Sequence, residues 1–120
     1  VSNTYFMERQ QRISYTLKFC IGGMFGMLNK KLMLSPLAAT KEDFENTILY
    51  YLHSRGVVRF NHVSFKSKMF AEGGIGNKAD REFQNEQATY YLMYNYPKLL
   101  SIFTRKDHWK EIRLNHRYKF

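Results

Sequence analysis

The clearest pattern of apolar and polar positions lies between residues 40 and 56, where it repeats with the period of an α-helix. Its apolar positions recur three or four residues apart and form one stripe, made of Phe44, Ile48, Tyr51 and Leu52. Thr40 stands at the N-cap position with Asp43 three residues on, and Gly56 stands where a left-handed C-cap is common. The pattern therefore predicts a helix that begins after Thr40 and ends before Gly56.

A second helix is predicted from about Asn77 to Tyr94, after a glycine-rich turn. Pro97 disfavours helical backbone in the residue before it and marks the end of this helix. The side expected to face the core carries Ala79, Phe83, Tyr90 and Tyr94.

Three further segments suit β-strands, in which side chains alternate between two faces. The first covers about residues 57–70 and gathers on one face Val63, Phe65 and Met69. The second, residues 98–105, is apolar nearly throughout, as a central strand is. The third runs from about Lys110 to Phe120, and its core-facing positions are Ile112, Leu114, His116, Tyr118 and Phe120.

The predicted order of elements from residue 40 is helix, strand, helix, strand, strand. A strand–helix–strand unit implies a parallel pair with a right-handed crossover, and the last two strands are close enough to pair as a hairpin. Residues 1–39 follow no lasting period and form a basic N-terminal extension in this interpretation. The sequence thus predicts a small α/β domain over residues 40–120, with a mixed sheet and packed helices, preceded by that extension.

Composition adds a core and a charge to this outline. Of the 120 residues, 44% are hydrophobic and 17% are aromatic, which is enough to bury a core. The net charge of +9, from 19 Lys and Arg against 10 acids, indicates an acidic partner such as nucleic acid, an anionic membrane or an acidic protein. No apolar run approaches the roughly 20 residues of a membrane span.

Few residues suggest catalysis. Cys20 is the single cysteine, so the chain has neither a dithiol nor an internal disulfide. The four histidines have no metal-ligand spacing. Gly73, Gly74 and Gly76 precede a helix, as in phosphate-binding loops, but they lack the spacing of G-x-G-x-x-G and of a P-loop, so a sharp structural turn is favoured. The sequence predicts a protein that is not an enzyme, with no metal site and no cofactor.

The cations gather in two parts of the chain, and we interpret both as RNA-binding. In the extension the candidates are Arg9, Arg12, Lys18, Lys30 and Lys31. In the domain they are Lys66, Lys68, Lys110, Arg113, Arg117 and Lys119. Alternate strand residues stand about 6.8 Å apart on one face, so such a row can meet RNA phosphates without reading bases. A merely solvated strand face is the alternative.

The order of several features between Thr47 and Arg105 resembles a known family. The first part carries Thr47, Tyr51 and Leu52, then Gly56, then Val57, Val58, Phe60 and Val63. The second part carries Gly74 and Gly76, then Arg81 and Phe83, then Asn95 near Pro97, ahead of the segment LLSIF. This order is similar to the thioredoxin-like family shared by mitochondrial ribosomal proteins and a small accessory subunit of respiratory complex I, and most of all to its small-ribosomal-subunit member.

The resemblance implies a thioredoxin-like fold that lacks thiol chemistry, because the turn EGGIGNK contains no cysteine. It also implies a structural constituent of the mitochondrial ribosome in the matrix, most simply of the small subunit. Its partners would be ribosomal RNA and neighbouring ribosomal proteins, with no small-molecule substrate. Three alternatives stay open: an accessory subunit of complex I that uses the fold for protein contacts, a thioredoxin-like enzyme, and a free single-strand RNA binder.

Overall fold

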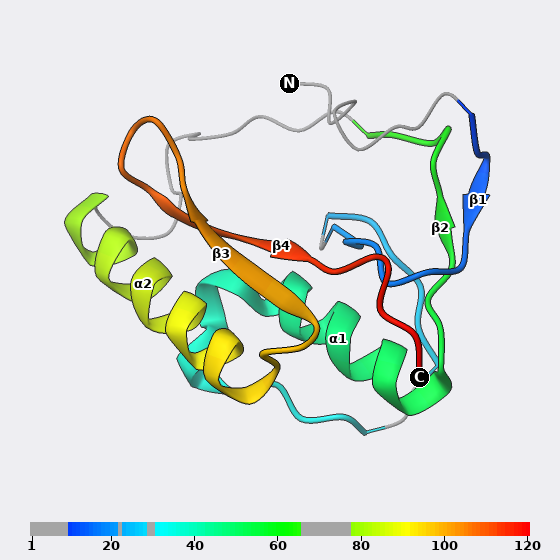
Figure 1. The fold of residues 1–120 in the computed structure, drawn as a ribbon, viewed down its shortest axis with the longest axis horizontal. Coiled ribbons are helices and arrows are strands. Elements are labelled where there is room, and N and C mark those ends of the chain that lie inside the picture. Colours follow the sequence, from blue (N-terminus) through cyan, green and yellow to red (C-terminus); the bar gives the residue numbers. More distant parts are fainter. Residues whose placement is uncertain (1–9, 22, 29–30, 66–77) are drawn as a thin grey trace.

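The computed structural model describes residues 10–21, 23–28, 31–65 and 78–120. This part of the chain forms a small α/β protein with two α-helices and two antiparallel two-stranded sheets (Figure 1). The elements follow one another as β1 (Ile13–Ser14), the 3-10 helix η2 (Pro36–Lys41), α1 (Glu42–Ser54), β2 (Arg59–Phe60), α2 (Lys78–Asn95), β3 (Leu100–Thr104) and β4 (Lys110–Leu114).

Helix α1 lies where the sequence predicts a helix, but both predicted caps are wrong. Helix α1 has Lys41 at its N-cap position, with no hydrogen bond from a capping side chain. The capping side chain belongs to the preceding η2, where the Ser35 hydroxyl accepts a hydrogen bond from the Leu37 N–H at 3.2 Å. Thr40 instead donates its hydroxyl to the Gln84 carbonyl at 3.3 Å. At the other end Arg55, rather than Gly56, adopts the left-handed conformation, with φ 57°. The predicted apolar stripe buries Ile48 and Tyr51 and half-buries Phe44, whereas Leu52 is exposed.

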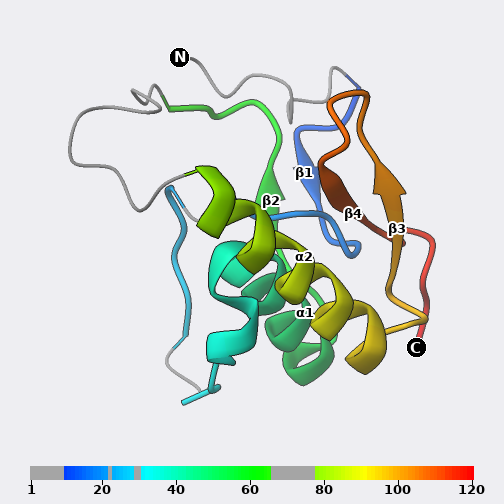
Figure 2. The ribbon, with the colours of Figure 1, turned by 90° about the vertical axis from the view of Figure 1, so that its left-hand side faces the viewer.

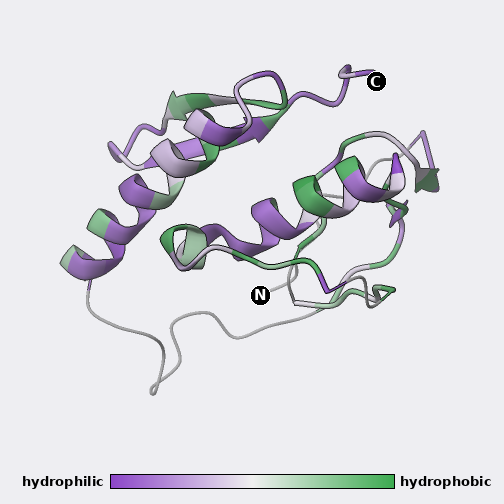
Figure 3. Cartoon of the chain, turned by 90° about the horizontal axis from the view of Figure 1, so that it is seen from below, coloured by the Kyte–Doolittle hydropathy of each residue, from purple (hydrophilic) through white to green (hydrophobic). Residues whose placement is uncertain are grey.

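Helix α2 has nearly the predicted bounds, but the predicted inner face is wrong. Phe83, Tyr90 and Tyr94 are exposed, with 87% of Tyr94 accessible, and Ala79 is exposed as well. The buried positions are Asn85, Ala88, Thr89 and Leu92. The ribbon of α2 is mostly hydrophilic, with only isolated hydrophobic residues along it (Figure 3).

Small and hydrogen-bonded side chains decide which face of α2 is buried. The helix packs mainly against η2, beside which it runs in Figure 2. The Asn85 amide donates to the Lys110 carbonyl at 2.7 Å, and the Thr89 hydroxyl donates to the Asn85 carbonyl at 2.7 Å. Because these polar groups are satisfied inside the protein, they can be buried at little cost, and the bulky aromatic rings point outward.

The predicted hairpin is present, but both sheets of the described residues are antiparallel, so the parallel pairing of the predicted mixed sheet is not found there. Strands β3 and β4 pair antiparallel, with Leu100 opposite Leu114 and Thr104 opposite Lys110. Among the described strands β3 has only β4 as a partner, so it is not central. Strand β2 belongs to the other sheet, in which it pairs antiparallel with β1. The Asn61 N–H extends that pairing by donating to the Arg12 carbonyl at 2.8 Å.

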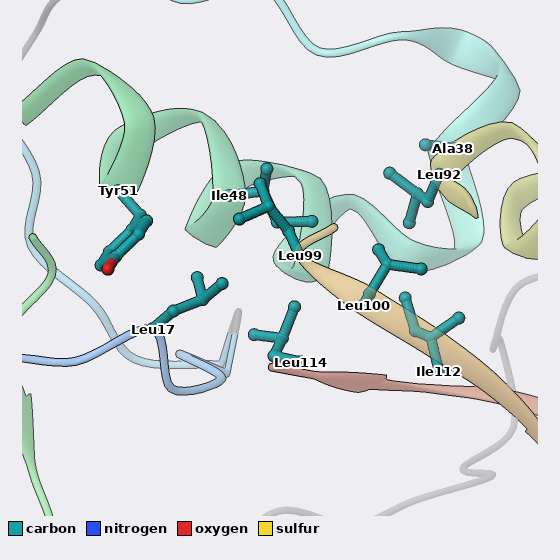
Figure 4. Packing of buried hydrophobic residues seen from close by; sticks show 9 residues of the cluster. All are labelled: Leu17, Ala38, Ile48, Tyr51, Leu92, Leu99, Leu100, Ile112 and Leu114. Carbon is teal, nitrogen blue, oxygen red and sulfur yellow. The ribbon is translucent and has the colours of Figure 1, made fainter. Parts of the chain in front are cut away.

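The hydrophobic core draws on segments from both sides of the boundary predicted near residue 40. Its buried members are Leu17, Ala38, Ile48, Tyr51, Leu92, Leu99, Leu100, Ile112 and Leu114 (Figure 4). The Leu17 side chain lies in the space between Tyr51 of α1 and Leu114 of β4 and is fully buried. The described part of the predicted extension is therefore built into the fold through Leu17, Ala38 and β1.

Strand β4 ends at Leu114, well before the predicted end at Phe120. Asn115 turns the chain, because its carbonyl accepts from the Tyr118 N–H and its side chain accepts from the Arg117 N–H. The last residues fold back onto α1, where the ring of Phe120 stacks on that of Tyr51 with centroids 5.0 Å apart. Arg117 and Lys119 therefore follow a turn and are not on the strand.

Neither described helix combines the length and apolar character that crossing a membrane would require. Within the same residues, no group of three or more His, Cys, Asp or Glu side chains is placed to hold a metal ion.

A buried carboxylate joins η2 to α1. Glu45 is 2% exposed, and its Oε2 accepts a hydrogen bond from the Ser35 N–H at 2.9 Å. Burial raises the pKa of Glu45, and hydrogen bonds from the Ser35 backbone and the Tyr91 side chain offset part of that effect.

Glu45→Gln is expected to flatten the pH dependence of the free energy of unfolding from pH 4.5 upward, over the range in which the raised folded-state pKa of Glu45 lies. Because the folded-state pKa of Glu45 lies above its ordinary value of 4.5, this group contributes stability below that pH and loses it as the pH rises through the folded-state value. Glutamine cannot ionise, yet it keeps an oxygen acceptor for Ser35. Urea unfolding at several pH values measures the slope. Glu42→Gln, at an exposed position in the same first turn, is the control, and a slope unchanged by Glu45→Gln would contradict the assignment.

Candidate nucleic-acid interface

A groove of about 640 Å³ runs beside β4. Its walls come from β4, from the N-terminal segment 17–19, from the first turn of α1, and from β2 and β3. We call it the basic groove and define it by its charged and aromatic lining residues: Lys18, Phe19, Phe44, Arg59, Phe103, Glu111, Arg113 and His116. The fold therefore brings together side chains that lie almost 100 residues apart in the sequence.

Three cations reach the basic groove from three different segments: Lys18, Arg59 and Arg113. Arg59 is held in place, because its Nε donates to Asn61 Oδ1 at 2.6 Å and its Nη1 donates to the Phe19 carbonyl at 3.2 Å. Arg113 is exposed, and its guanidinium carbon lies 5.0 Å from the centroid of the Phe103 ring, a cation–π contact.

Glu111 is the one acid among the described residues that line the groove, and its charge is already compensated. Its carboxylate forms an ion pair with the Nζ of Lys41, whose side chain is only 5% exposed. The pair also fixes η2 to β4, since Lys41 is the last residue of η2. Among the described lining residues the cations outnumber this single acid, a balance that suits an anionic ligand.

The three phenylalanines give the same groove an aromatic wall. The rings of Phe19 and Phe44 lie against each other, with centroids 4.2 Å apart and planes tilted by 33°. Phe103 is 37% exposed, so part of its ring is open to solvent. Cations beside accessible aromatic rings are the combination that proteins use to bind single-stranded nucleic acids.

Of the predicted RNA-binding residues that the structure describes, two line the groove, Lys18 and Arg113. Lys110 lies half-buried in the first position of β4, where its carbonyl accepts from Asn85. Four more of the predicted RNA-binding residues are exposed but lie outside the groove: Arg12, Lys31, Arg117 and Lys119. The other predicted positions, Arg9, Lys30, Lys66 and Lys68, lie outside the described residues.

The predicted row of Arg113, Arg117 and Lys119 along one strand face is wrong, because β4 ends at Leu114 and Asn115 turns the chain. Arg59, Phe103 and His116 also line the groove, although the sequence did not predict them as site residues. Arg59 offered a weak signal, since it is a cation set between the apolar residues Val58 and Phe60.

A second, mainly apolar cavity of about 530 Å³ lies between segment 19–28, α1 and segment 56–65. Several of its lining side chains are large, apolar and exposed, and we call them the apolar face: Met24, Phe25, Met27, Leu28, Val58, Phe60 and Val63. A large exposed patch of such side chains is typical of a surface that contacts another protein or a ligand. The backbone of Gly23 lies close to the ring of Phe65, since a Cβ on Gly23 would be 2.1 Å from Cζ of Phe65.

Cys20 also lines this apolar cavity and is half-buried. Burial raises the pKa of its thiol, with opposing but smaller effects from Arg59 and from a hydrogen bond with Thr47. A protonated thiol is a poor nucleophile and a poor metal ligand, so Cys20 acts here as a packing residue.

Comparison of the chain with protein-family models, with curated proteins and with solved structures finds no match.

Proposed function

We propose that this protein is an RNA-binding structural component of a ribonucleoprotein particle. The observation that carries the proposal is the basic groove, where Lys18, Arg59 and Arg113 converge beside exposed aromatic surface and the lining acid is paired internally. The net charge of +9 supports the same partner class, because it attracts polyanions over a distance.

The proposed binding mechanism is neutralisation of RNA phosphates by these cations. Each phosphate contact releases condensed counterions, so the affinity for single-stranded RNA should fall with a log–log salt slope of about −0.7 per phosphate. The protein needs no cofactor and no small-molecule substrate for this role. Arg59 suits it well, because its two hydrogen bonds hold the side chain in place before RNA binds.

We further propose that the particle is the mitochondrial ribosome, in the matrix, and that the small subunit is the place of assembly. This part of the proposal, like a thioredoxin-like relationship, is supported by the sequence features that begin at Thr47 and end near Arg105. The apolar face supports membership in a large assembly, because neighbouring ribosomal proteins would cover it.

The apolar face also favours a second candidate, an accessory subunit of respiratory complex I, which would use it for protein contacts without RNA. Sedimentation of mitochondrial extracts through a salt-containing density gradient separates the two. Co-migration with the small ribosomal subunit, lost after ribonuclease treatment, is expected. Co-migration with complex I, unaffected by ribonuclease, would support the second candidate and overturn the ribosomal one.

The double variant Lys18→Glu/Arg113→Glu is expected to lower the affinity for single-stranded RNA by about 10- to 100-fold at moderate salt, since it puts two repulsive charges in the groove. Fluorescence anisotropy with a labelled mixed-sequence RNA measures the loss. The control Lys98→Glu/Lys106→Glu makes the same change in net charge at exposed positions outside the groove lining. Equal losses for both variants would show that only net charge matters and would contradict the groove as the binding site.

A further inference from the structure

We infer that the basic groove holds one unpaired nucleotide of a single-stranded RNA, with its base against Phe103 and its phosphate beside Arg59 and Lys18. The inference rests on the proposed function and specifies its ligand: an unpaired nucleotide rather than the backbone of a duplex. The assignment comes from the way in which β3, β4 and segment 17–19 place one accessible ring and several cations around the same space.

The ring of Phe103 is partly open to solvent within the groove. It stands on β3 opposite Glu111 of β4, and Arg113 reaches it diagonally across the hairpin. The ring is 37% exposed and lies inside the groove, so part of its surface is accessible to a ligand there. A nucleobase can stack on such a ring or on the plane of the neighbouring guanidinium.

The arrangement of charge around the groove also suits a nucleotide. Arg59 and Lys18 line the groove from segments other than the hairpin, so they can meet the phosphate while the base lies against Phe103. Arg59 is held in position by its hydrogen bonds to Asn61 and to the Phe19 carbonyl, so its positive charge has a fixed place in the groove lining. The ion pair between Glu111 and Lys41 limits the repulsion that the acid would exert on a phosphate.

The size of the groove agrees with a nucleotide. Its volume of about 640 Å³ lies within the range of about 300–1,000 Å³ of small-molecule sites. A duplex keeps its bases stacked and paired, and it would leave the aromatic wall unused. A peptide made of Asp and Glu alone would use the cations but has no flat ring to place against Phe103, whereas every nucleotide carries one, so the aromatic wall favours the nucleotide.

Binding of two short chains of equal charge by the full-length protein tests the inference. One is a five-residue single-stranded RNA, and the other is the same ribose-phosphate chain without bases. Stacking of one base predicts about 5- to 150-fold weaker binding of the chain without bases. Phe103→Leu is expected to weaken RNA binding by a similar factor and to leave the binding of the baseless chain unchanged. Phe83→Leu, at an exposed phenylalanine outside the groove, is the control and should change neither.

The outcomes separate this inference from the proposed function. Equal binding of both chains, or an effect of Phe103→Leu on both, would overturn the nucleotide site and leave RNA binding standing. Preference for a duplex of matched length would do the same. Binding of neither chain, or of an acidic pentapeptide in place of RNA, would overturn both proposals. Circular dichroism of each variant checks that the fold is retained. If Phe103→Leu does not fold, Phe103→Tyr is measured in its place. Because it keeps an aromatic ring, Phe103→Tyr should bind RNA as the parent protein does.

Discussion

Leu92→Ala is expected to lower the free energy of unfolding by about 2–5 kcal/mol, because it removes a fully buried side chain from the centre of the core. In Figure 4 Leu92 of α2 lies beside Ala38 and near Leu100 of β3. The loss contains both the transfer energy of the removed methyl groups and the cost of the cavity that remains. Since domains of this kind are stable by about 5–15 kcal/mol, the effect is a large part of the total.

The matched control lies on the same helix. Phe83 is 70% exposed, so Phe83→Ala should change stability by less than about 0.5 kcal/mol although it removes more carbon atoms. Urea denaturation followed by tryptophan fluorescence measures both variants. The opposite ranking, with Phe83→Ala the more destabilising, would show that α2 packs through the aromatic face that the sequence alone predicts.

Local signals located most of the helices and the hairpin. The three- and four-residue spacing of apolar positions found α1, and Pro97 marked the end of α2 close to its last residue, Asn95. The short connection between two apolar segments found the pairing of β3 with β4. These features depend on residues close together in the chain, which is why the sequence alone was enough.

Long-range contacts decide the features that the sequence did not predict. The inner face of α2 is set by the hydrogen bond from Asn85 to the Lys110 carbonyl, 25 residues away. The partner of β2 is β1, whose Ile13 lies opposite Phe60. The spacing of neighbouring residues predicts neither the buried face of α2 nor the partner of β2. Aromatic residues at helical intervals fit burial and exposure equally well, and the sequence of a strand does not specify its partner.

The candidate site shows the same division. Counting charge predicts a basic surface, and two of the residues that it selects, Lys18 and Arg113, line the basic groove. It could not find Arg59 or Phe103 as their neighbours, because the groove exists only where segment 17–19, β2 and the hairpin meet. The same counting gave weight to Arg117 and Lys119, which a turn at Asn115 removes from the strand.

Leu17→Ala is expected to cost about 2–5 kcal/mol of stability, because Leu17 is fully buried although it lies in the segment that the sequence presents as an extension. The side chain lies between Tyr51 and Leu114 (Figure 4), and in a closely packed core its truncation leaves a cavity. For the same reason a chain that begins at residue 40 is expected not to fold, because it lacks Leu17, Ala38 and the β1 partner of β2.

Met24→Ala is the control for Leu17→Ala, since Met24 lies in the same N-terminal part of the chain and is 62% exposed. It should change the free energy of unfolding by less than about 0.5 kcal/mol. Urea unfolding measures the two point variants, and the dispersion of amide signals in an NMR spectrum reports on the shortened chain. A shortened chain with native-like dispersion, together with a Leu17→Ala variant as stable as the parent, would mean that residues 10–39 only attach to a domain that is complete without them. The basic groove would then lose Lys18 and Phe19 as fixed parts of its wall, so this result bears on the RNA site as directly as on the fold.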